Sequence, residues 1–120
     1  MEILAVALVI FVALFHVQVF VMEAFLWKTP RALNAFGMTA KEAEISHPLA
    51  INQGVYNLFL AAGLLLSFFL DDSFRFQAQL FFLICIVIAA LTVGAVISKK
   101  IMLIQGLPAL LALAIVIIAY

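Results

Sequence analysis

The sequence has few charged residues. Only 10% of its 120 residues are Asp, Glu, Lys or Arg, whereas about a quarter of the residues are charged in a typical soluble domain. The six basic and six acidic residues cancel, so no basic surface indicates binding to nucleic acid. The lone Cys85 excludes an intramolecular disulfide. These shortages argue against a soluble domain, a nucleic-acid-binding protein and a disulfide-stabilised scaffold.

Hydrophobic residues make up 69% of the chain, and they fall into four long segments. A helix of about 20 residues crosses a hydrocarbon core about 30 Å thick. The sequence therefore predicts one all-α transmembrane domain over residues 1–120, an integral membrane four-helix bundle. Glu2 replaces the basic leader of a secretory signal, so we expect the first helix to be retained. The predicted spans are Ile3 to Leu26, Leu49 to Leu70, Phe76 to Ile97 and Ile101 to Tyr120.

The basic residues of the connections predict the orientation. The first and third connections carry Lys28, Arg31, Lys41, Lys99 and Lys100, against Arg75 alone in the second. Basic connections stay on the cytosolic side of a membrane. We therefore expect both chain ends to lie outside.

The first connection is the long one, and it contains a helix signal. Thr39 and Glu42 have the spacing of a capping box, in which each side chain bonds a backbone amide of the other residue. This predicts a short amphipathic helix from Ala40 to about Ser46, which is either a lid at the inner interface or part of a solvated linker. Pro48 fits the first turn of the following helix, where its missing amide proton matters little.

Polar residues within the spans concentrate towards the predicted inner side. Glu23, Asn52, Gln53 and Gln105 each lie about four residues from the inner boundary, about 6 Å deep, and Thr92 lies about 8 Å deep. Tyr56 and Asn57 follow at about 12 to 14 Å, and His16 is deepest at about 16 Å. The outer half, by contrast, is almost entirely aliphatic and aromatic.

Helical spacing favours an arrangement of these side chains around an interior. His16 and Glu23 are seven residues apart, while Asn52 with Tyr56 and Gln53 with Asn57 are each four apart. An unpaired amide in hydrocarbon costs several kcal/mol, so we expect these groups to bond one another, backbone carbonyls or water. Together they predict a polar pocket in the cytoplasmic half, lined by Asn52, Gln53, Tyr56, Asn57, Gln105, Thr92 and Trp27.

A purely structural interpretation stays open for most of these residues, because amides and hydroxyls also hold membrane helices together. Carboxylates within spans are functional candidates by default, and Glu23 and His16 are the only acid/base pair that the spans offer. Two histidines and one carboxylate without a ligand spacing do not predict a metal site, and no cofactor motif is present.

Several stretches together resemble a known family. These are HVQVFVMEAFLW (His16 to Trp27), NQGVYNLFLAAGL (Asn52 to Leu64) and KIMLIQGLPALLAL (Lys100 to Leu113). They are similar to a bacterial family of small four-helix membrane proteins, the domain of unknown function numbered thirteen hundred and four. The resemblance runs nearly end to end and implies a multi-pass protein of the bacterial plasma membrane, but it implies no activity.

Three functional hypotheses fit these residues. In the first, the pocket binds a small lipophilic or amphipathic molecule from the inner leaflet, with or without acid/base chemistry. In the second, the chain is a subunit of a small multidrug-type transporter, for which a homo-oligomer would have to supply polar groups on the outer side. In the third, it is a structural or partner-binding membrane protein. Membrane lipid is the expected surrounding partner in each case.

Overall fold

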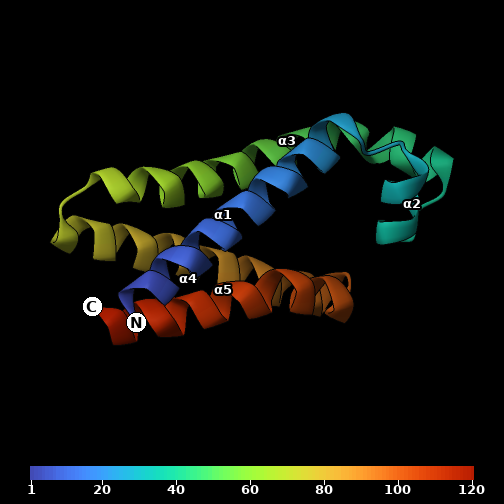
Figure 1. Cartoon of the computed structure of the whole chain (residues 1–120). Helices are drawn as coiled ribbons and strands as arrows, with labels where there is room; N and C mark the ends of the chain where they lie inside the picture. The colour runs from blue at the N-terminus through green and yellow to red at the C-terminus, as the bar shows by residue number, and fades with distance from the viewer. The chain divides into compact units, whose positions relative to one another are not determined.

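The computed structural model describes residues 1–120 and consists of helices and their connections. Four helices are long and apolar enough to cross a membrane, and they correspond to α1, α3 with the 3₁₀ turn η1, α4 and α5 (Figure 1). This confirms the predicted all-α fold with four candidate spans. The elements in order are α1 (Glu2–Phe25), α2 (Pro30–Phe36), α3 (Ala40–Leu66), η1 (Ser67–Phe69), α4 (Asp72–Val96) and α5 (Lys99–Ala119).

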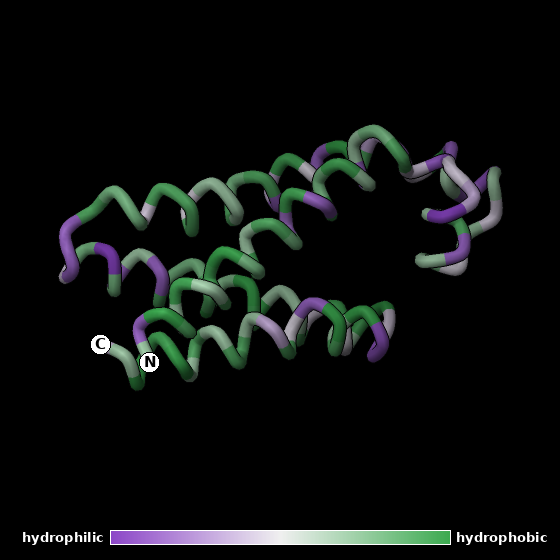
Figure 2. Tube along the Cα trace, viewed as in Figure 1, coloured by the Kyte–Doolittle hydropathy of each residue, from purple (hydrophilic) through white to green (hydrophobic).

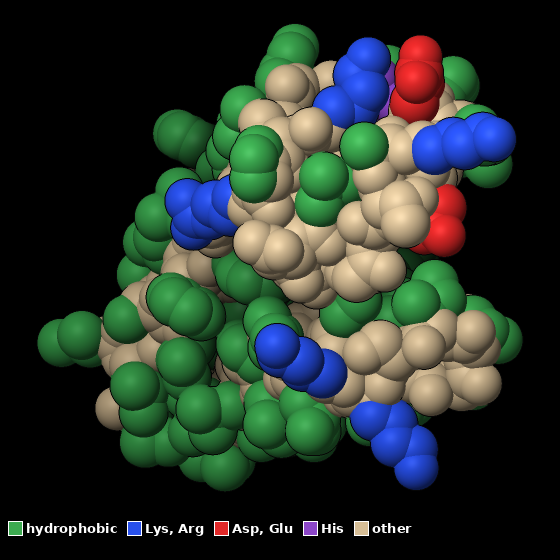
Figure 3. All heavy atoms as spheres, turned by 90° about the vertical axis from the view of Figure 1, so that its right-hand side faces the viewer, with side chains coloured by type: hydrophobic (Ala, Val, Ile, Leu, Met, Phe, Trp, Pro, Cys, Tyr) green, Lys and Arg blue, Asp and Glu red, His purple; other side chains and the backbone are tan.

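The surface suits a hydrocarbon environment. Hydrophobic residues run along the four long helices, and hydrophilic ones concentrate in the connections (Figure 2). Large apolar side chains stand exposed, including Ile3 at 87% and Phe69 at 86%, and Figure 3 shows hydrophobic side chains at the surface beside Lys, Arg, Asp and Glu. A soluble monomer rarely exposes apolar patches of this extent. The chain is therefore built as a multi-pass membrane protein.

The helix that contains the second predicted span begins earlier than expected. Thr39 and Glu42 do form the capping box, with Glu42 N donating to Thr39 Oγ1 at 3.1 Å and Thr39 N donating to Glu42 Oε2 at 3.3 Å. The helix that they cap does not end near Ser46, because it continues as α3 to Leu66. Pro48 therefore lies inside α3 and not in its first turn. A proline inside a helix removes only one backbone hydrogen bond, so a long apolar helix can continue through it.

The short helix of the first connection is α2, at Pro30–Phe36. Its N-cap is Thr29, whose side chain accepts from Ala32 N at 3.4 Å, and Pro30 supplies a preset φ at the first helical position. Gly37 ends the helix in the left-handed conformation with φ of 63°, which glycine adopts without strain. Thr-Pro before and Gly after the segment are start and stop signals that the sequence interpretation overlooked.

The chain divides into two compact units. The first unit, Leu14–Ala61, holds the second half of α1, α2 and most of α3. Its apolar core contains Trp27, Ala43 and Ala50. Trp27 is buried, donates from Nε1 to Ser46 Oγ at 3.0 Å and packs on the Phe36 ring at a centroid distance of 4.8 Å. This residue therefore fixes α2 and the start of α3 to the end of α1.

The second unit comprises Met1–Ala13 with Ala62–Tyr120. Here α4 and α5 lie side by side (Figure 1), joined by a short turn in which Ser98 caps α5 by accepting from Ile101 N at 3.4 Å. Small residues allow the two helices to approach closely. A Cβ placed on Gly106 would lie 3.0 Å from Ala90 Cβ, and one placed on Gly94 would overlap the Met102 side chain. This agrees with the spacing of Ala90 and Gly94 in the sequence, four residues apart on one helix face.

Candidate functional site

The most distinctive polar contact joins α1 to α3. Asn57 donates from Nδ2 to Glu23 Oε1 at 2.6 Å, and both residues are only 6% exposed. The same amide donates to the Gln53 carbonyl at 3.2 Å. Bonds to a carboxylate oxygen are short and strong when the surroundings exclude water. A buried acid on one span is thus held by an amide on another.

A glycine makes this contact possible. A Cβ on Gly54 would lie 3.2 Å from Glu23 Cβ and 3.2 Å from the Phe20 carbonyl oxygen. That spacing is tighter than an ordinary van der Waals contact, so any larger residue would push α1 and α3 apart. Gly54 is one turn from Asn57 on the same face of α3. The close approach at Gly54 therefore brings the Asn57 amide within reach of Glu23.

His47 lies on the same side of α3. Its Nε2 is 3.3 Å from the Ala24 carbonyl oxygen, next to Glu23 in the sequence, and the side chain is half-buried. His47, Gly54 and Ala61 recur at seven-residue intervals, with Ala50 and Asn57 between them. This spacing keeps all five on one helix face. A stripe of small residues interrupted by His and Asn was the signal that could have identified the face of α3 that packs on α1.

The other polar residues of this stretch have a different place from the one expected. Asn52 and Gln53 are exposed, and Tyr56 is 58% exposed with its ring edge-on to Phe59 at 5.9 Å. Asn52 and Asn57 are five residues apart, which puts them about 140° apart around the helix. Asn57 therefore faces α1, while Asn52 and Tyr56 point outward.

His16 and Glu23 share one face of α1, but they are not neighbours. Seven residues of helix separate them by about 10 Å along the axis, too far for a direct hydrogen bond. His16 is fully buried and its ring meets Phe15 edge-on at 5.5 Å. The predicted acid/base pair thus consists of two buried groups two turns apart.

Gln105 and Thr92 belong to the other unit. Gln105 is half-buried on α5, and Thr92 is exposed on α4, where its hydroxyl donates to the Ile88 carbonyl of its own helix at 2.9 Å. The Thr92 hydroxyl is thus satisfied locally.

The sequence analysis did not predict a second buried polar contact, which joins two residues assigned to the outer half of the bundle. Gln79 donates from Nε2 to Ser67 Oγ at 3.1 Å, and that hydroxyl donates to the Leu64 carbonyl at 2.6 Å. Gln79 and Ser67 are each 1% exposed. These two bonds link Gln79 of α4 to Ser67 of η1 and to Leu64 of α3, so the contact fixes the turn between two spans. The structure contains no group of three or more His, Cys, Asp or Glu residues arranged to hold a metal ion.

Four apolar helices with a buried carboxylate–amide pair define a multi-pass, α-helical membrane protein. The chain belongs to the family described as protein of unknown function, DUF1304, whose model matches residues 10–117. It is 34% identical over 115 residues to the uncharacterized protein YpaA of Lactococcus lactis subsp. lactis (strain IL1403), with 94% of this chain and 96% of the relative covered. The family resemblance inferred from the sequence motifs is therefore confirmed. No solved structure matches the chain.

Proposed function

We propose that the protein is a plasma-membrane protein that binds a small amphipathic molecule with a cationic head, and that Glu23 receives the head. The single observation that supports this is the buried Glu23 carboxylate, 2.6 Å from Asn57 Nδ2. An acidic group within a span is expensive and is retained chiefly where it meets a partner, a substrate or a proton. Asn57 orients the carboxylate but leaves it without a cationic partner from its own helix pair.

The surroundings of Glu23 favour a ligand that is partly apolar. Gly54 lies beside the start of the Glu23 side chain and beside Phe20, and the exposed Gln53 side chain lies one turn from Asn57 on α3. An amphipathic cation can place its charged head at the carboxylate and its apolar chain along the helices. The charge then has a partner within the membrane, and the apolar chain stays out of water.

Binding is better supported than acid/base catalysis. A general acid and base acting on one substrate must both be within hydrogen-bond reach of it. Glu23 and His16 are separated by about 10 Å of helix, and His16 is fully buried. Glu23 therefore acts as a binding group in this proposal and not as half of a catalytic pair.

The test uses two probes that differ mainly in charge, decyltrimethylammonium and the neutral decyldimethylamine N-oxide, added to the full chain in a maltoside detergent. We expect saturable thermal stabilisation by the cation alone, about 1.4 kcal/mol when the free probe is at ten times its Kd. Glu23→Gln keeps an acceptor for Asn57 and removes the charge, so it should abolish the effect. The matched control is Glu44→Gln, which removes an exposed carboxylate from α3 and should leave the effect intact.

Two results would contradict the proposal. One is equal stabilisation of the wild type by both probes, which would indicate a general detergent effect. The other is an unchanged response of Glu23→Gln to the cation, which would leave the Glu23–Asn57 contact as a purely structural link between helices.

A further inference from the structure

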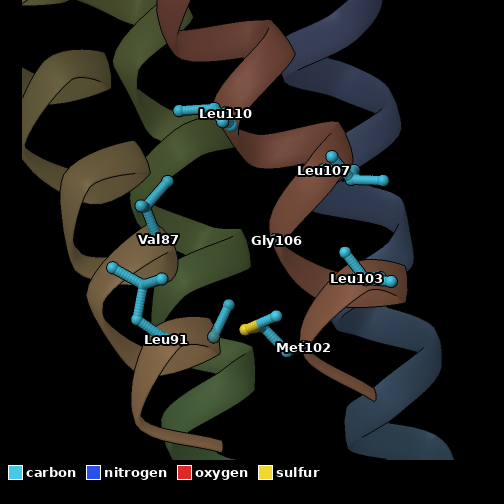
Figure 4. A pocket seen from close by; sticks show the side chains of 8 residues that line it. Val87, Leu91, Met102, Leu103, Gly106, Leu107 and Leu110 are labelled. Carbon is cyan, nitrogen blue, oxygen red and sulfur yellow. The ribbon is translucent and has the colours of Figure 1, made fainter. Parts of the chain in front are cut away.

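A groove of about 130 Å³ runs between α4 and α5 in the second unit (Figure 4). In Figure 4, Met102 points from α5 towards α4, where Val87 and Leu91 lie on the opposite wall. Every lining side chain is apolar. The lining residues are Val87, Ala90 and Leu91 of α4, and Met102, Leu103, Gly106, Leu107 and Leu110 of α5.

The length and lining of the groove suit an alkyl chain. From Met102 to Leu110 the helix rises about 12 Å, and apolar side chains line the groove along that length. An extended acyl chain that lies parallel to α5 can contact these side chains throughout.

Two lysines stand at one end of this groove. Lys99, Leu103, Gly106 and Leu110 are spaced at four, three and four residues, which puts Lys99 on the groove face one turn before Leu103. Lys100 lies seven residues before Leu107, another lining residue. Helical side chains lean towards the N-terminus, so both ammonium groups extend away from the apolar groove towards the membrane surface.

No acidic residue of either helix neutralises these charges. Asp72 is the last acid in the sequence, and it lies at the far end of α4. Lys99 and Lys100 are both exposed, and the first turn of α5 adds the partial positive charge of a helix N-terminus. An apolar groove that opens beside two unneutralised lysines is complementary to a molecule with one alkyl chain lying parallel to α5 and an anionic group at its end.

We propose that the groove between α4 and α5, with Lys99 and Lys100 at its end, is a binding site for an anionic phospholipid. One acyl chain lies along Leu103, Gly106 and Leu110, and the phosphate meets the two lysines. Basic clusters beside transmembrane helices attract anionic headgroups by about a factor of five per lysine. This site shares no residue with the Glu23 site, so its test is independent of the function proposed above.

The experiment is a titration of delipidated full-length protein with phosphatidylglycerol and with phosphatidylcholine of the same acyl chains, followed by native mass spectrometry. We expect phosphatidylglycerol to bind more tightly to the wild type. Lys99→Gln with Lys100→Gln should reduce the ratio of the two affinities by about twenty-five-fold, at about five-fold per lysine. Using the ratio within each variant cancels any loss of folded protein.

Two matched controls separate a site from general attraction. Lys41→Gln removes an exposed lysine from the first turn of α3 and should leave the affinity ratio unchanged. Leu103→Trp should fill the groove and weaken both lipids, whereas Ile104→Trp should not, because Leu103 and Ile104 are both 49% exposed but only Leu103 lines the groove. The proposal is overturned if the wild type does not prefer phosphatidylglycerol or if the double lysine variant keeps the preference. It is also overturned if Lys41→Gln lowers the affinity ratio as much as the double lysine variant does, or if Ile104→Trp weakens lipid binding as much as Leu103→Trp does.

Discussion

The Glu23–Asn57 contact predicts an unequal response to the loss of either partner. Asn57→Leu removes the donor of the 2.6 Å bond and leaves a carboxyl group that is 6% exposed without it. Glu23→Leu is milder, because the Asn57 amide keeps its 3.2 Å bond to the Gln53 carbonyl. We therefore expect Asn57→Leu to destabilise the protein more than Glu23→Leu does.

The magnitude follows from two limits. A buried polar group that loses its partner costs about 1 to 3 kcal/mol, whereas interhelical hydrogen bonds in membranes average about 0.6 kcal/mol and reach about 1.7. The short length of this bond and the burial of both residues favour the upper part of the membrane range. We expect about 1.5 kcal/mol for Asn57→Leu, about 0.5 for Glu23→Leu and a coupling of about 1 kcal/mol between them, so that the double variant is less damaged than the sum predicts.

The assay is reversible unfolding in mixed micelles of dodecylmaltoside and dodecyl sulfate, followed by the fluorescence of Trp27. Trp27 is the only tryptophan and is buried next to α2, so its emission reports on the unit that contains the contact. Asn52→Leu is the control, because it makes the same chemical change on the exposed side of α3. Strict additivity of the two substitutions, or an equal effect of Asn57→Leu and Asn52→Leu, would refute this account of the contact.

Two further outcomes are expected, the first in the same assay and the second by circular dichroism during heating, because the second substitution removes the only tryptophan. Gly54→Val should destabilise by about 1 to 3 kcal/mol, since its side chain would force apart α1 and α3 at Phe20 and Glu23, and a neutral Gly54→Val would show that the helices separate freely there. Trp27→Phe keeps a ring against Phe36 but loses the 3.0 Å bond to Ser46, so a loss of about 0.5 to 1.5 kcal/mol in thermal stability is expected, and no loss would mean that packing alone fixes α2.

The number and type of long helices could be predicted from the sequence, because a single segment satisfies its own backbone in lipid only as a helix and 69% of the residues are hydrophobic. The helix boundaries were less accessible. A proline such as Pro48 can lie in the first turn of a helix or in its interior. The capping box at Thr39 favours the interior position only when the helix that it starts continues past Pro48. About 20 residues suffice to cross the hydrocarbon core, so the expected length favoured a helix shorter than α3.

The polar residues show where the sequence is ambiguous. Asn52 with Tyr56 and Gln53 with Asn57 have the same spacing, so periodicity alone does not tell which pair faces another helix. The deciding feature is the close approach at Gly54, since Asn57 shares its face and Asn52 does not. Tertiary contact therefore separates two polar stripes that local sequence treats as equal.

Depth in the membrane also does not determine which side chains meet. Counting residues from the membrane boundary assigns Glu23 and Asn52 to the same depth, but it does not tell which way either side chain points around its helix. The buried contact of Ser67 with Gln79 was missed for a related reason. Residue counts along each helix do not show that Ser67 and Gln79 face each other across the turn between η1 and α4.

The continuity of α3 has a mechanical consequence. Its 27 residues extend about 40 Å, roughly 10 Å more than the hydrocarbon thickness, so an upright α3 would extend beyond the hydrocarbon at one end. Between Lys41 and Asn57 there is no connecting loop to absorb motion. A tilt of the N-terminal end of α3, imposed by a docked molecule, would therefore be transmitted to the Asn57 amide. It would change the hydrogen bond from Asn57 to Glu23 without any ligand entering the membrane.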